Sequence, residues 1–177
     1  MQLIAQKLGK NDKHDRLAFV RADGSSAETS MPRQGILPYD LVHFVVESRL
    51  PFRHGFLSLV ARGAEPAFAM QQAHEPGNPG IGIETVQVEA IVEALQAQLW
   101  SGQFVCEDFI DGVWTACAAR GCPGLDFSSY GIENHWYAPA LTLQEKWAAL
   151  PYFSSLSLKF AVDGGLPFPV SIRLGAG

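Results

Sequence analysis

The sequence predicts an α+β fold, in which an antiparallel sheet built from N-terminal strands and a C-terminal hairpin packs against a helical middle section. Three observations support this prediction. Residues near both ends alternate between apolar and polar, apolar residues in the middle recur with a helical period, and glycine, proline or aspartate marks most junctions. Because a lone hairpin is only marginally stable, we expect the strands from the two ends to join in one sheet.

The N-terminal strands are expected at residues 1–8, 16–21 and 27–31. Residues 9–12 would connect the first two strands. Asp23 and Gly24 form a tight-turn signal before the third, because glycine accepts a positive φ without steric cost. The three segments therefore predict a three-stranded meander.

The helical section begins around Pro38, which suits a first helical position because its missing N–H needs no partner there. Apolar residues cover most of this helix, so we expect it to be buried on most sides and to end before Pro51. Further helices are expected at residues 56–62, 67–73, 84–100 and 104–120. In the clearest of them, 84–100, Glu89 and Glu93 lie opposite the apolar positions.

The last third of the chain combines a segment without periodicity, one more helix and the C-terminal hairpin. Residues 122–140 are expected to form an ordered loop or short helical turns. Thr142 and Glu145 match a capping box, which predicts a helix over residues 143–150. The hairpin would pair residues 156–162 with residues 168–174 around a turn at 163–165.

Composition excludes several classes of protein. The chain has 177 residues, of which 47% are hydrophobic and 18% charged, with a formal net charge of −5. This length predicts a single α+β domain spanning residues 1–177. The mild acidity argues against nucleic-acid binding, and the longest apolar stretches are far shorter than the ~20 residues that cross a bilayer. With no signal-peptide pattern and an odd number of cysteines, we expect a cytoplasmic protein without a membrane partner.

The first candidate site is a polar stripe on the helix that follows Pro38. Asp40, His43 and Glu47 fall within one sector of that helix, and a histidine and a carboxylate four residues apart can reach the same metal ion or proton. His74 could complete such a metal site from a loop. The alternative is that the stripe is simply the solvated side of the helix.

The second candidate site lies in the segment without periodicity, which mixes aromatic rings with polar groups, as ligand pockets and protein contact surfaces do. Its proposed ligand-binding residues are Tyr130, Glu133, His135, Trp136 and Tyr137. The alternative is a long connection that its own aromatic residues hold against the core.

The cysteines show no zinc-binding spacing. Cys117 shares an apolar helical face and is expected in the core. Cys122 follows a helix end and is the thiol whose reactivity we would test.

These observations predict a small non-catalytic ligand-binding or protein-interaction domain. The alternative is a metal-assisted hydrolase-like enzyme that uses His43 and Glu47. A homodimer pairing through an exposed strand edge or an apolar patch is a further option. Whether the protein is an enzyme stays open, and the sequence carries no cofactor fingerprint that would assign a cofactor.

Overall fold

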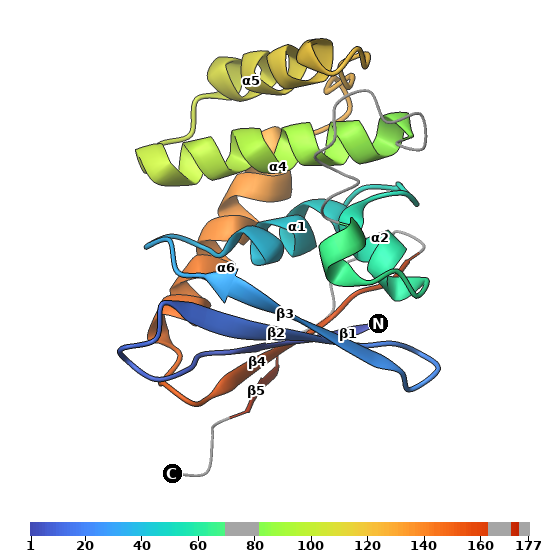
Figure 1. Cartoon of the computed structure of the whole chain (residues 1–177). Helices are drawn as coiled ribbons and strands as arrows, with labels where there is room; N and C mark the ends of the chain where they lie inside the picture. The colour runs from blue at the N-terminus through green and yellow to red at the C-terminus, as the bar shows by residue number, and fades with distance from the viewer. Residues whose placement is uncertain (70–81, 163–170, 174–177) are drawn as a thin grey trace.

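The computed structural model describes residues 1–69, 82–162 and 171–173, which form one antiparallel sheet with helices over one of its faces (Figure 1). The sheet has the strand order β3-β2-β1-β4-β5. Its strands are β1 (Gln2–Gln6), β2 (His14–Val20), β3 (Ser26–Pro32), β4 (Ser155–Lys159) and β5 (Ser171–Arg173). The predicted α+β class is therefore confirmed.

The two ends of the chain meet in the centre of this sheet. Leu3 of β1 pairs with Phe19 of β2 on one side and with Leu158 of β4 on the other, and all three side chains are buried. The N-terminal meander and strand β4 of the C-terminal hairpin thus share one hydrophobic face, as the alternation of apolar residues predicted. The predicted hairpin turn at 163–165 lies outside the described residues.

The helices form successive layers over this face (Figure 1). The layer nearest the sheet contains α1 (Tyr39–Glu47) and α2 (Phe56–Ala61). The next layers are α4 (Ile83–Ser101) and then α5 (Cys106–Ala119). Helix α6 (Ala138–Ala149) runs from the level of α4 down to the sheet. Pro38 precedes α1 as its N-cap residue. Residues 66–69 are helical, and the rest of the predicted 67–73 helix, like His74, lies outside the described residues.

Helix α6 begins earlier than the capping-box pattern predicted. A π-helical turn, η1 (Glu133–Tyr137), continues directly into α6 at Ala138. Thr142 is therefore an interior residue, and its hydroxyl donates a hydrogen bond to the carbonyl of Ala138 at 3.0 Å. The capping box at Thr142 and Glu145 is wrong, because no free helix start exists there for a side chain to satisfy.

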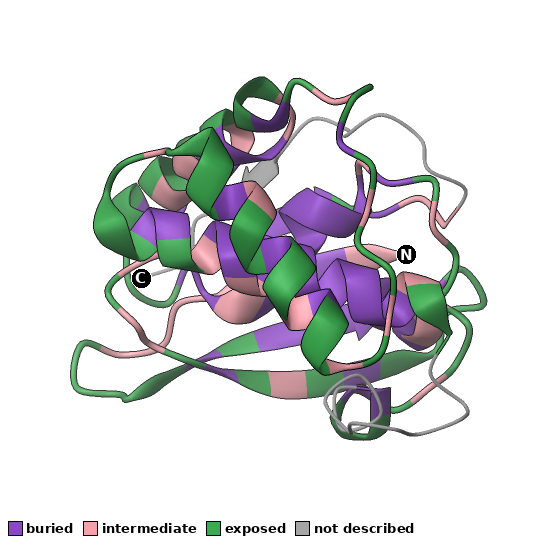
Figure 2. Cartoon of the chain, turned by 90° about the horizontal axis from the view of Figure 1, so that it is seen from above, coloured by how far each residue is buried: buried purple, intermediate pink, exposed green. Residues whose placement is uncertain are grey.

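Helix α4 is buried on more sides than its sequence pattern predicted. It packs between α1 and α5, and its residues are mostly buried (Figure 2). Glu89, expected opposite the apolar face, is 0% exposed, because α1 covers the side on which it lies. Buried residues from the sheet and from all these helices form one continuous hydrophobic core. Within the described residues, no helix is long and apolar enough to cross a membrane.

Candidate functional site

The polar stripe of α1 lies inside the protein. Asp40 is 7% exposed, His43 0% and Glu47 4%, so the interpretation of the stripe as a solvated face is wrong. The physical reason is that α1 packs against α2, α4 and α6 as well as lying over the sheet. The sequence showed the apolar surface of α1 but not that neighbouring helices also cover its polar stripe.

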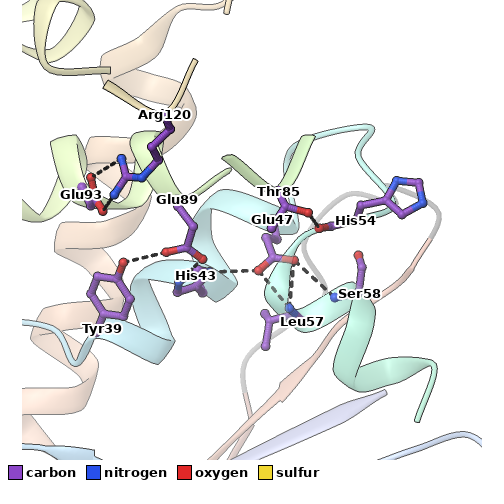
Figure 3. A network of polar contacts seen from close by, with 10 residues as sticks. All are labelled: Tyr39, His43, Glu47, His54, Leu57, Ser58, Thr85, Glu89, Glu93 and Arg120. Carbon is purple, nitrogen blue, oxygen red and sulfur yellow. Dashed lines mark hydrogen bonds and ion pairs between the residues drawn. The ribbon is translucent and has the colours of Figure 1, made fainter. Parts of the chain in front are cut away.

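Glu47 connects α1 to the start of α2. Its carboxylate accepts hydrogen bonds from the backbone N–H groups of Leu57 at 3.0 Å and Ser58 at 3.3 Å, groups that have no partner within α2 (Figure 3). Nδ1 of His43 lies 3.0 Å from the same carboxylate. Gly55 permits this approach, because a Cβ at that position would collide with the Glu47 carboxylate.

The opposite side of His43 faces Glu89 on α4. His43 Nε2 lies 3.4 Å from Glu89 Oε1, and the Tyr39 hydroxyl donates a hydrogen bond to Glu89 Oε2 at 2.9 Å (Figure 3). Tyr39, Glu89, His43 and Glu47 therefore form a continuous polar array that joins α1 to α4 and, through Glu47, to α2. Sequence analysis had not included Tyr39 or Glu89 in any site.

The electrostatics of this array make His43 a cation. Burial lowers the pKa of the imidazole, but Glu89 and Glu47 outweigh burial and raise the pKa of His43 to about 10. His43 is therefore protonated at neutral pH. Its Nδ1–H donates to Glu47, and its Nε2 faces Glu89 in an ion pair whose 3.4 Å separation is longer than an ordinary hydrogen bond. Burial, followed by the charge of Glu89, raises the pKa of Tyr39, which stays neutral, and burial also raises the pKa of Asp40.

The array holds a proton and does not present open metal ligands. A metal needs ring nitrogens and carboxylate oxygens with free lone pairs, whereas the protonated ring of His43 offers no lone pair and Glu47 already accepts backbone hydrogen bonds. In residues 1–69, 82–162 and 171–173, no group of three or more His, Cys, Asp or Glu side chains is arranged to hold a metal ion. The metal assignment to Asp40, His43 and Glu47 stays a prediction.

Two of the five predicted ligand-binding residues lie in the core. Trp136 is 0% exposed and Tyr137 6%, and Trp136 packs against Phe109 of α5 with ring centroids 6.2 Å apart. Both rings hold η1 against the helices, so neither offers an open face to a ligand.

The other three predicted residues reach the surface to different degrees. Glu133 is exposed, whereas Tyr130 and His135 are half-buried. The Nε2–H of His135 donates a hydrogen bond to the carbonyl of Arg49 at 2.9 Å, which ties η1 to the end of α1. A ligand site in this segment stays a prediction.

A cavity of about 260 Å³ lies elsewhere, between one end of the sheet and the C-terminal half of α6. We call it the α6 cavity. The side chains that line it and matter here are Lys7, Asp15, Arg33, Gln144, Trp147 and Tyr152. None of them belonged to a predicted site, because they come from four segments that the fold alone brings together.

Two cations and two aromatic rings form the wall of the α6 cavity. Lys7 Nζ lies 5.6 Å from the ring centroid of Trp147 and 6.0 Å from that of Tyr152, and Arg33 Cζ lies 5.7 Å from the Tyr152 ring. These distances allow cation–π attraction. Tyr152 is 47% exposed, so its ring forms an accessible side of the cavity.

Asp15 fixes the position of Arg33. This carboxylate is 2% exposed, and it accepts hydrogen bonds from Arg33 Nη2 at 2.6 Å, Arg33 Nε at 3.0 Å and the backbone N–H of Leu8 at 2.9 Å. The hydrogen bond with Asp15 raises the pKa of Arg33. The guanidinium is thus held rigidly, and the acceptor capacity of Asp15 is largely used.

Lys7 closes the C-terminal end of α6. Its ammonium donates to the carbonyls of Ala148 at 2.9 Å and Leu150 at 3.0 Å, which have no partner within the helix. Burial lowers the pKa of Lys7, while the charge of Asp15 opposes that change. One of its three N–H groups is left for a further acceptor.

This end of the molecule is positively charged, although the whole chain is acidic. The cationic side chains here are Lys7, Lys10, Lys13 and Arg33, and the carboxylates are Asp12 and Asp15. The backbone carbonyls of Lys10 and Lys13 both accept hydrogen bonds from Arg33, so this loop lies next to Arg33. Among the charged side chains that line the α6 cavity, the cations Lys7 and Arg33 outnumber the one carboxylate, Asp15, in a chain with a net charge of −5.

One sequence signal could have found this cavity. Asp15 occupies the same strand face as Leu17 and Phe19, so the alternation of β2 already placed a carboxylate toward the core. A buried carboxylate requires a cationic partner, and Arg33 supplies it.

Comparison with known proteins gives no further guide to this site, since no family model, no curated protein and no solved structure matches the chain.

Proposed function

We propose that this protein is a ligand-binding domain that holds a small organic anion with a flat ring in the α6 cavity. The proposal agrees with the non-catalytic binding function expected from the sequence, but it rests on a different set of residues. Its main support is the imbalance of polar groups around the cavity, where the side-chain acceptors are engaged by the protein and several donors are not.

The side-chain donors that are not engaged belong to two glutamines and to Lys7. The side-chain oxygen of Gln144 accepts from the backbone N–H of Leu37 at 2.9 Å, and that of Gln34 accepts from the amide of Gln96 at 2.8 Å. Their own side-chain NH₂ groups have no partner among the described residues. A ligand that supplies acceptors, such as a carboxylate, matches what remains.

The aromatic side chains in the wall of the cavity favour a ligand whose uncharged part is a flat ring. A ligand ring offset against Tyr152, or edge-on to it, gains contact without needing a hydrogen bond, and the positive charges of Arg33 and Lys7 beside that ring attract the anionic group of the ligand. A cavity of 260 Å³ holds roughly eight or nine water molecules at ~30 Å³ each, so it fits a single-ring molecule. Peptides and larger cofactors would extend outside it.

Isothermal titration calorimetry with benzoate tests the proposal, and benzamide serves as a neutral ligand of the same shape. We expect benzoate to bind at least ~10-fold more tightly, a difference of about 1.4 kcal/mol. Lys7→Met should abolish the preference, Lys7→Arg should keep part of it, and Lys146→Met, a change on the exposed side of α6, should leave it intact. Equal binding of the two ligands, or an unchanged preference in Lys7→Met, would overturn the proposal.

The metal-assisted hydrolase that uses His43 and Glu47 is the alternative function, and the geometry favours it less. Both side chains are buried, and they are bonded to each other and to neighbouring groups. Elemental analysis of the purified protein tests this alternative directly, because a hydrolase of this kind would contain a divalent metal. For the protein as a whole we propose a cytoplasmic location, on the basis of its unpaired cysteines.

A further inference from the structure

Helix α5 ends in a Schellman motif that places two cysteines at its two contacting positions. The N–H of Cys122 donates to the carbonyl of Cys117 at 2.9 Å, and the N–H of Gly121 donates to the carbonyl of Ala118 at 3.0 Å. Gly121 has a φ of +65°, which the motif requires. In such a motif the side chains that correspond to Cys117 and Cys122 pack against each other, and the neighbouring Cys122 thiol contributes to the raised pKa of Cys117. The Cys122 sulfur also lies within hydrogen-bonding distance of the carbonyl oxygens of Pro123, at 3.4 Å, and Ile83, at 3.7 Å.

The two thiols differ in their access to solvent. Cys117 is 0% exposed and lies in the core beneath the helix end, whereas Cys122 is partly exposed. Cys106, the third cysteine, is exposed at the first residue of α5, the opposite end of the helix from Cys117. A solvent-borne oxidant therefore reaches Cys122 directly, and Cys117 is the thiol placed to react next.

Exposure to solvent determines which sulfur acts as the nucleophile. Burial raises the pKa of both thiols, that of Cys117 to about 11. At Cys122 the neighbouring Cys117 thiol opposes this rise. Because Cys122 is the thiol of this pair that solvent reaches, and because the thiolate is the reactive form, oxidation starts at Cys122 and becomes faster as the pH rises.

We propose that Cys117 and Cys122 form a dithiol site that peroxide oxidises to an intramolecular disulfide. The Cys122 thiolate attacks one oxygen of hydrogen peroxide, the O–O bond breaks, and the second oxygen leaves as water after taking up a proton. The resulting sulfenic acid on Cys122 is then attacked by Cys117 sulfur. The S–S bond forms, the S–O bond breaks, and the hydroxyl leaves with the Cys117 proton as a second water.

The disulfide would restrain the junction between α5 and α4. Arg120 lies between the two cysteines, and its guanidinium pairs with Glu93 of α4, with contacts of 2.5 and 3.2 Å. Closing residues 117–122 into a covalent loop holds Arg120 beside α4, near the Tyr39–Glu89 end of the buried array (Figure 3). The site is separate from the α6 cavity, so its test does not depend on the proposed ligand.

Peptide mapping of the native, full-length protein tests this inference. The protein is treated with hydrogen peroxide at mildly alkaline pH, remaining thiols are alkylated, and the chain is digested with trypsin. Because trypsin cleaves after Arg120, the disulfide would join two peptides that otherwise separate, with a combined mass lower by two hydrogen atoms. Cys106 and Cys117 lie in the same tryptic peptide, so the linked pair is fragmented to locate the alkyl group. We expect this linked pair, with the alkyl group on Cys106.

Two variants distinguish the mechanism from general oxidation. Cys117→Ser should lose the linked pair and accumulate a Cys122 sulfenic acid that dimedone traps, whereas Cys106→Ser should form the linked pair as the unchanged protein does. The inference would be overturned if Cys122 in the unchanged protein stayed reduced, was oxidised to sulfinic acid without the linked pair, or formed a disulfide only with Cys106 of another chain.

Discussion

Replacing Glu89 with glutamine removes one of the two carboxylates that neutralise the buried imidazolium of His43, and it preserves the shape of the side chain. In the structure, His43 Nε2 lies 3.4 Å from Glu89 Oε1, and the Tyr39 hydroxyl donates to Glu89 Oε2 at 2.9 Å. The glutamine oxygen can still accept from Tyr39. The substitution therefore leaves the charge of His43 partly uncompensated with little change in packing.

The free-energy cost of Glu89→Gln follows from the raised pKa of His43 and from the general cost of breaking a buried ion pair. The rise of the His43 pKa from 6.5 to about 10 corresponds to about 5 kcal/mol of stabilisation, at about 1.4 kcal/mol per pH unit. The charge of Glu89 is the largest of the causes that raise this pKa. Removing one partner of a buried ion pair costs about 3–5 kcal/mol in general, so we expect Glu89→Gln to cost about 3 kcal/mol, since Glu47 remains beside His43.

The contribution of His43 to the free energy of unfolding decreases as the pH rises. Because the pKa of His43 is higher in the folded protein, its stabilising contribution is complete below about pH 6.5 and is lost as the pH rises toward 10. The free energy of unfolding should therefore fall between neutral and alkaline pH, by up to about 1.4 kcal/mol per pH unit from this group. In Glu89→Gln the pKa of His43 is lower, so this fall should end at a lower pH and be smaller in total.

Urea unfolding followed by tryptophan fluorescence at several pH values measures both effects. Glu93→Gln is the matched control, since Glu93 lies one turn further along α4 in a partly exposed pair with Arg120, where such a change costs about 0–1 kcal/mol. A cost for Glu89→Gln no larger than that of the control, or a fall in stability between neutral and alkaline pH as large as in the unchanged protein, would show that Glu89 does not stabilise the charge of His43.

Three further substitutions have outcomes that the structure determines, each measured by chemical unfolding. Gly55→Ala should cost about 2 kcal/mol or more, because its Cβ would displace the Glu47 carboxylate; a cost below about 0.5 kcal/mol would contradict that contact. Asp15→Asn should cost about 3 kcal/mol by leaving Arg33 unpaired, and a negligible cost would show that the pair does not form. Thr142→Ala should change stability by less than about 0.5 kcal/mol, whereas a loss of about 1 kcal/mol would restore the capping box.

The sequence was sufficient for the sheet because the strand pattern there is local. Apolar and polar residues alternate around Leu3, Leu17 and Leu158, and in each strand the alternation marks the face that is buried. One antiparallel sheet buries all three of these faces together. The helix over residues 84–100 was predicted nearly to its ends for the same reason, since its apolar residues recur along the chain. The errors arose where a neighbouring element decided the outcome, as at Thr142, where η1 runs into α6.

The sites were harder to predict because their residues come from distant segments. His43 and Glu47 lie one turn apart, so the sequence identified their pairing, but Glu89 joins them only because α4 packs on α1. Lys7 and Arg33 meet at the α6 cavity for a similar reason, and neither residue has a distinctive local motif. Contacts between elements, which periodicity does not encode, therefore determine which polar groups converge.

Benzoate binding to the α6 cavity can be mapped on the amide spectrum of ¹⁵N-labelled protein. We expect saturable shifts that are largest for the amides of Lys7, Arg33, Gln144 and Tyr152, and no comparable shifts with benzamide. Shifts concentrated instead on residues 130–137, or no saturable shift at any amide, would contradict binding in the α6 cavity.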